Sequence, residues 1–163
     1  MRNKIIILAV ITLVIFLSGC IQSDVSNINS KAITINNHIK RGDDYYNLSA
    51  SDTNKLLLNQ ALSECNNASS EYNQAQTAAQ DAYVSATNSN DAVFVEYLQN
   101  VLGEVQAKLN ATSELKIAIN LLQTNQTSSA DDHLATANSY MQKALEYQKN
   151  LENIVNQNPS KFK

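Results

Sequence analysis

The chain has 163 residues, a length that suits one domain, and its 15 acidic and 12 basic side chains give a net charge of −3. Three glycines and one proline are too few for an all-β sandwich or barrel, because such folds need many turn residues. The charge balance leaves no basic patch from which to expect nucleic-acid binding.

Residues 1–19 are predicted to be a signal peptide. Arg2 and Lys4 give a basic start, an apolar run follows over residues 5–17, and small residues close the segment. This order is typical of a secretory signal. The uncharged stretch 5–22 barely approaches the ~20 residues that cross a bilayer, which favours a processed signal over a permanent span.

The motif Leu17-Ser18-Gly19-Cys20 resembles the lipobox of prokaryotic lipoproteins, in which an aliphatic residue, a small residue and Gly or Ala precede a cysteine. The resemblance covers the leader only. It implies a diacylglyceryl group on the sulfur of Cys20 and cleavage between Gly19 and Cys20, so that two acyl chains hold the protein on a membrane. The expected location is therefore extracytoplasmic, at the cell surface or in a periplasm. The alternatives are an ordinary signal peptide and an uncleaved anchor that ends in cysteine.

After a short tether over 20–23, a first helix is predicted from a cap at Ser23 or Asp24 to about Asn47, loosened or stopped at Gly42. Its apolar residues recur at three- and four-residue steps, which predicts one buried face. They are Val25, Ile28, Ala32, Ile35, Ile39 and Tyr46. Residues 47–53 (NLSASDT) predict a turn, with a new cap at Asp52 or Thr53.

A second helix is predicted over 54–87, with a bend or break at 65–70 because Asn and Ser compete with helical hydrogen bonding. Many small residues in its seam predict close packing against another helix. The seam comprises Leu57, Ala61, Cys65, Ala68, Tyr72, Ala75, Ala79, Ala82 and Ala86. Residues 87–91 predict the next turn.

The third helix carries Gly103 in its interior, which indicates close packing or a kink, and close packing is preferred. Its stripe contains Leu98, Val101 or Leu102, Val105, Leu109, Thr112, Leu115, Ile119 and Leu122. Residues 125–128 close it. The fourth helix, with Leu134, Ala137, Met141, Ala144, Leu145, Leu151 and Val155, ends before Pro159, and Ser128 with Asp131, or Ser129 with Asp132, is expected to cap its start.

Four amphipathic helices with short connections predict an all-α, antiparallel up-down four-helix bundle over 24–157, about 40–50 Å long, followed by a tail over 158–163. The alternative is a pair of tetratricopeptide-like helical hairpins, suggested by the residues before Pro159 and by Gly42-Asp43-Asp44-Tyr45. No period of 34 residues recurs, which favours the bundle. An even number of antiparallel helices places the tail near Cys20, with Lys161 and Lys163 beside the lipid or in a frayed, solvated end.

No catalytic, cofactor-binding or metal-ligating residue is predicted, and no cofactor. With Cys20 lipidated, Cys65 has no partner for an internal disulfide and is expected to be a buried, inert thiol. His133 follows two acids interpreted as caps, and His38 stands alone. The tyrosines are interpreted as core-boundary residues with buried rings and solvated hydroxyls, although a tyrosine-lined groove is an alternative. They are Tyr45, Tyr46, Tyr72, Tyr83, Tyr97, Tyr140 and Tyr147.

The sequence favours a non-enzymatic, lipid-anchored scaffold, spacer or protein-interaction module. The alternative is a ligand-binding or sensory accessory lipoprotein with a pocket between helices. The expected partners are the membrane, through Cys20, and another protein. The stretch between Lys55 and Lys108 has six acids and no base, and is interpreted as a solvated face or a surface for a basic partner. Oligomeric state, and glycosylation at Asn47, Asn67, Asn110 or Asn125, are left open.

Overall fold

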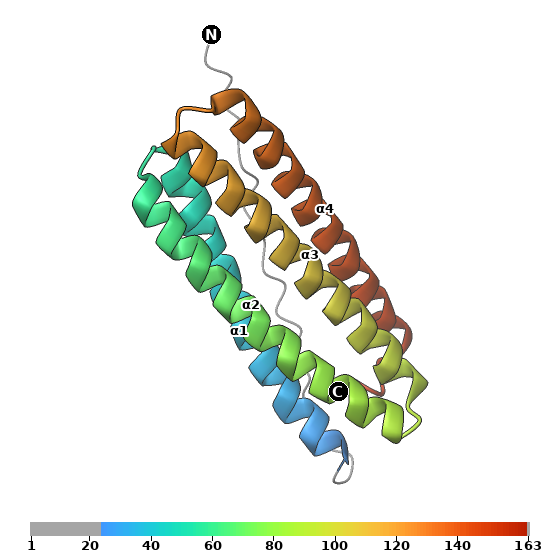
Figure 1. Cartoon of the computed structure of the whole chain (residues 1–163). Coiled ribbons are helices and arrows are strands. Elements are labelled where there is room, and N and C mark those ends of the chain that lie inside the picture. The colour runs from blue at the N-terminus through green and yellow to red at the C-terminus, as the bar shows by residue number, and fades with distance from the viewer. Residues whose placement is uncertain (1–23, 163) are drawn as a thin grey trace.

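Four long helices make up residues 24–162, the part of the chain described in a computed structural model of the protein (Figure 1). Each contains 31 or 32 residues. At 1.5 Å per residue, each is about 47 Å long. The helices are α1 (Asp24–Asn54), α2 (Leu58–Asn88), α3 (Ala92–Gln123) and α4 (Thr127–Gln157).

Consecutive helices pack against each other, α1 on α2, α2 on α3 and α3 on α4, and short turns make each pair antiparallel (Figure 1). The two outer helices, α1 and α4, do not contact each other over their described residues. This arrangement confirms the predicted all-α up-down bundle. The tetratricopeptide alternative is wrong, because each single helix is nearly as long as a whole 34-residue repeat.

The core follows the predicted stripes closely in α2, where eight of the nine seam residues are buried and only Leu57 is not. Small side chains let neighbouring helices approach there. Gly42 and Gly103 serve the same purpose, because a Cβ atom at either position would lie 2.5 Å from a ring carbon of Tyr72 or Tyr147, respectively. Close packing at Gly103 is thus confirmed, and neither glycine ends a helix.

Helix α1 does not stop at Asn47, and the turn predicted over 47–53 is wrong. The polar side chains of this stretch find partners within the packed structure. Ser49 Oγ donates to the carbonyl of Ala61 on α2 (2.8 Å), and Thr53 Oγ1 donates to the carbonyl of Ser49 (2.7 Å). Because these groups are buried and hydrogen-bonded, the helix continues to Asn54 and α2 begins later, at Leu58.

Two smaller predictions also need correction. Helix α2 passes through residues 65–70 without a break, because that face packs on its neighbours. Helix α4 starts at Thr127 with Gln126 as its N-cap and no capping side chain, so Ser128 and Ser129 do not form the predicted caps.

The three interhelical turns share one backbone geometry. Their central residues, Leu56, Asn90 and Asn125, have φ values of 61°, 54° and 59°. The following amide donates to a carbonyl five residues back at 2.9, 3.2 and 2.9 Å, the hydrogen bond of a Schellman motif. Glycine and asparagine are the residues that adopt this left-handed conformation readily, which makes Leu56 the exception.

Candidate functional site

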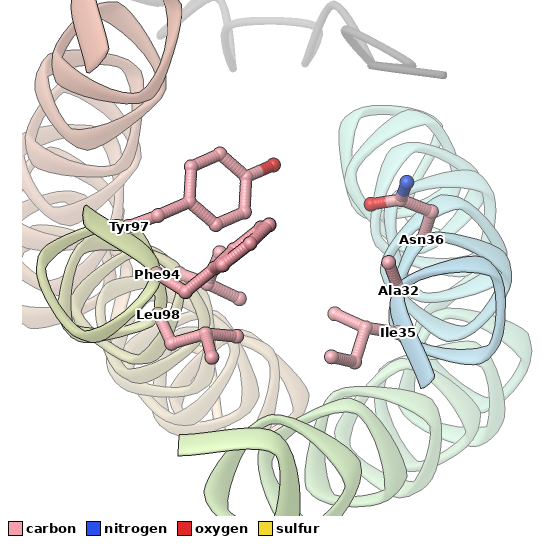
Figure 2. Close-up of a pocket in the computed structure, with 7 residues that line it drawn as sticks. Ala32, Ile35, Asn36, Phe94, Tyr97 and Leu98 are labelled. Carbon is pink, nitrogen blue, oxygen red and sulfur yellow. The ribbon is translucent and has the colours of Figure 1, made fainter. Parts of the chain in front are cut away.

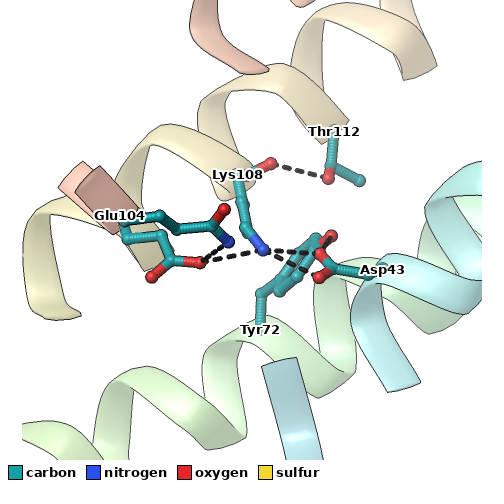
Figure 3. A network of polar contacts seen from close by, with 6 residues as sticks. Asp43, Tyr72, Glu104, Lys108 and Thr112 are labelled. Atoms are coloured by element: carbon teal, nitrogen blue, oxygen red, sulfur yellow. Dashed lines mark hydrogen bonds and ion pairs between the residues drawn. The ribbon is translucent and has the colours of Figure 1, made fainter. Parts of the chain in front are cut away.

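A cluster of buried, charged side chains is linked by hydrogen bonds and ion pairs in the interior of the bundle (Figure 3). The Lys108 ammonium donates to both carboxylate oxygens of Asp43 at 2.8 Å and lies 2.9 Å from Glu104 Oε1. Tyr72 OH donates to Asp43 Oδ1 at 2.7 Å, and Gln148 Nε2 donates to Glu104 Oε1 at 2.7 Å. We call these five residues the Lys108 network. It joins all four helices, and the Lys108 side chain has no exposed surface.

The electrostatics of the Lys108 network do not suit proton transfer near neutral pH. Burial alone would lower the pKa of Lys108, but the carboxylates of Glu104 and Asp43 outweigh it and raise the pKa. Burial, reinforced by Asp43, also raises the pKa of Tyr72 well above its ordinary value. The lysine therefore stays a cation and the tyrosine stays neutral. Neither is an activated nucleophile or a general base, so we interpret the network as a structural element.

The sequence interpretation missed this network. It assigned Glu104 to a solvated acidic face, whereas Glu104 is buried and paired with Lys108. Two other acids of that face also meet cationic side chains. Glu71 lies 3.1 Å from Arg41, and Asp91 pairs with Lys161. The local signal was the spacing of Glu104 and Lys108, one helical turn apart. Their partner Asp43 lies 65 residues from Lys108, a separation that no local pattern reveals.

The two histidines lie on different helices and each contacts one carboxylate. His38 Nδ1 is 2.7 Å from Glu71 Oε2, and His133 Nδ1 pairs with Glu114 of α3. The acids that precede His133 do not cap α4, so their predicted role is wrong. Over residues 24–162, no group of three or more His, Cys, Asp or Glu side chains is placed to hold a metal ion.

The prediction for Cys65 is confirmed, whereas the prediction for the tyrosine hydroxyls is wrong at two positions. Cys65 is buried and free, as predicted, and its Sγ donates to the carbonyl of Thr112 at 3.1 Å. Burial raises its pKa to about 11, which leaves it protonated and unreactive at neutral pH. The hydroxyls of Tyr46 and Tyr72, expected to be solvated, are instead buried. That of Tyr46 has no hydrogen-bond partner among the described residues.

A small apolar pocket lies between α1 and α3, where Tyr97 and Phe94 face Ile35 and Ala32 (Figure 2). It holds about 10 Å³, which is close to the space that a single water molecule occupies. A ligand-binding cleft is usually larger by more than an order of magnitude. This pocket therefore gives no support to a ligand site at Tyr97.

The end of the bundle that holds the start of α1 and the end of α4 is closed by the C-terminal tail (Figure 1). Phe162 is buried against Phe94 and Tyr97, with ring centroids 5.2 and 5.1 Å apart. Lys161 binds Asp91, the N-cap of α3, and does not extend as a frayed end. Burial tends to raise the pKa of Asp91, but hydrogen bonds from Lys161 and from the Phe94 amide outweigh it and lower the pKa.

The opposite end carries the α1–α2 and α3–α4 turns, and there Gln123 at the end of α3 donates a 3.0 Å hydrogen bond to Asn59 near the start of α2. Leu56 and Leu57 form the first of these turns and are 55% and 48% exposed. We call this pair the leucine tip. Leu57 is also the N-cap of α2, and it offers no capping oxygen, whereas Asp91 accepts a hydrogen bond from the Phe94 amide at 3.3 Å.

Gly19 and Cys20, the predicted cleavage and lipidation sites, lie outside the described residues, and so does Lys163. None of the described helices combines the length and the apolar character needed to cross a membrane. Comparisons of the chain with protein-family models, with curated proteins and with solved structures give no match.

Proposed function

We propose that this protein is a non-enzymatic, lipid-anchored spacer or scaffold that works outside the cytoplasm. The lipobox-like leader supports the anchor, because it combines a secretory signal with a cysteine at the expected cleavage point. The lipid on Cys20 would hold the protein on a membrane, and the helical bundle would project from it.

The observation that carries the proposal is the position of the start of α1 relative to the C-terminal tail. Helix α1 begins at Asp24, four residues after Cys20, and the tail packs at the same end of the bundle (Figure 1). An anchor at Cys20 would therefore leave the α1–α2 and α3–α4 turns as the free end. With helices of 31 or 32 residues, that end would stand about 47 Å from the lipid attachment.

The interior supports the role of a stiff spacer. The Lys108 network ties the four helices together midway along their length, and Tyr72 is pinned between Asp43 and the backbone at Gly42. Each buried charge has a partner of opposite sign, so sliding one helix past another would separate buried ions. We infer that the bundle keeps its length and register under load.

The experiment compares substitutions of the two cysteines in the full chain expressed in a bacterial host. Cys20→Ser should move the protein from the membrane fraction to the soluble fraction and block cleavage at Gly19. Cys65→Ser is the matched control and should remain cleaved and membrane-bound, since Cys65 is buried and unpaired. If the Cys20→Ser protein stays as membrane-bound and as cleaved as the parent, the anchoring proposal is wrong. Mass spectrometry of the N-terminal peptide gives an independent readout.

A further inference from the structure

The leucine tip departs from the chemistry of the other two turns although its backbone is the same. Asn90 and Asn125 occupy the left-handed position elsewhere, and leucine fits that position poorly because its Cβ approaches the next carbonyl oxygen. The adjoining N-cap, Leu57, leaves the first amides of α2 without a side-chain acceptor, as Gln126 does for α4 and Asp91 does not for α3. Two neighbouring positions thus disfavour local stability, and at both of them an apolar side chain is turned toward solvent. Outliers of this kind are concentrated at functional sites.

The surroundings of the leucine tip define what it can contact. Residues 54–60 and 123–129, which form the free end, contain no acidic side chain, and their one charged side chain is Lys55. Lys55 is exposed, and its ammonium lies 3.0 Å from Asp52, whose side chain is almost fully buried. The rest of this surface consists mainly of uncharged amide and hydroxyl groups. Over these two stretches the surface presents apolar groups and one lysine, which is paired with Asp52, whereas the nearest exposed carboxylate, Asp132, lies about one turn further along α4.

These features favour a lipid surface over a protein partner. Two half-exposed leucines on a convex turn offer far less area than the ~800 Å² that each partner contributes to a stable protein interface. A bilayer needs no matching partner surface of that area, because shallow insertion combines apolar burial with attraction to anionic head groups. Under the proposed function, the membrane that holds Cys20 lies about 47 Å away. The lipid surface at the tip must then be a second one.

We propose that the free end of the bundle docks on a second lipid bilayer by inserting Leu56 and Leu57, with Lys55 facing anionic head groups. This inference depends on the proposed function, since it assumes that Cys20 holds the other end. It replaces the protein partner expected from the sequence with a membrane, so that the bundle bridges two lipid surfaces.

The test loads the lipidated full-length protein onto phosphatidylcholine vesicles through its own anchor. A second population of bare vesicles, made of phosphatidylcholine and phosphatidylglycerol in equal parts, is then added, and fluorescence energy transfer between the two populations reports tethering. The matched variant carries Leu56→Asn and Leu57→Gln, which reproduce the Asn125-Gln126 pair of the adjacent turn without a change of charge. Loading is measured separately for both proteins.

The parent should tether the bare vesicles, and the double variant should load equally well but bind the second population about a hundredfold more weakly, since each buried leucine contributes about tenfold. Lys55→Gln should weaken binding to anionic vesicles about fivefold and leave binding to pure phosphatidylcholine unchanged. Failure to load would contradict the anchor and not the tip. Normal loading with no tethering, or equal tethering by the double variant, would overturn the tip proposal. So would tethering that requires protein on both populations, because the partner would then be a second copy of the chain.

Discussion

The middle of the bundle and its free end both depart from the usual distribution, in which apolar side chains are buried and charged ones are exposed. In the middle, Lys108, Asp43 and Glu104 are charged and buried, and at the free end Leu56 and Leu57 are apolar and exposed. Every buried charge has partners within 3 Å, so the molecule itself accounts for that exception. The leucines have no such partner within the described structure. Buried charges that have partners within the molecule indicate a structural role. Exposed leucines without such a partner indicate a contact with something outside the chain.

The largest effect on stability should come from removing Lys108, the cation that pairs with the buried carboxylates. Lys108→Met leaves two carboxylates buried without their cation, and we expect the free energy of unfolding to fall by about 3–5 kcal/mol. Urea unfolding followed by circular dichroism measures the loss. The control replaces the charges together, as Asp43→Leu, Glu104→Met and Lys108→Met, and should recover part of the stability, because no unpaired ion remains although Tyr72 and Gln148 lose their hydrogen-bond acceptors. A single variant as stable as the parent would show that the network contributes little.

A smaller effect of opposite sign is expected at the free end. Leu56→Asn should raise the free energy of unfolding by about 1 kcal/mol, because asparagine tolerates the left-handed conformation better than leucine. Asn125→Leu is the reciprocal variant and should lower it by about the same amount. Thermal and urea unfolding of the pair provide the measurement. If both substitutions shift the free energy of unfolding in the same direction, the claim that leucine destabilises the left-handed turn position relative to asparagine is wrong.

The smallest effect concerns the C-terminal tail, at the end of the bundle where α1 begins. The folded-state pKa of Asp91 is lowered from 3.8, so its contribution to stability is present above that pH and is lost as the pH falls through the lowered value. Lys161→Gln removes the main cation, and we expect it to reduce the free energy of unfolding at neutral pH by about 0.2–1 kcal/mol. The difference between parent and variant should disappear in acid. If the difference in stability between parent and variant persists unchanged at low pH, it arises from packing of the tail and not from the ion pair.

The fold was largely predictable because its determinants are local. The three- and four-residue spacing of apolar side chains identified four helices, and the alanines of α2 marked the face that is buried. Gly103 was predicted to allow close packing and does so against Tyr147. These patterns depend on residues within one or two turns of each other, which a sequence displays directly.

The errors involve partners that are distant in sequence. Ser49 was placed in a predicted turn, but its hydroxyl bonds to Ala61 of the next helix. Glu104 was placed on a solvated face, but it is buried in a network that Asp43 completes from 65 residues before Lys108. Leu57 continues the heptad spacing of α2 but precedes the first turn of that helix, so it is not buried. In each case the contact that decides the outcome is made only after the helices pack.

The most direct test of the account measures stability and tethering on the same Leu56→Asn, Leu57→Gln protein. We predict a higher melting temperature together with loss of tethering to bare anionic vesicles, because the leucine tip disfavours folding and serves a second lipid surface. A protein that melts at or below the temperature of the parent and tethers as well as it does would contradict both parts of the account.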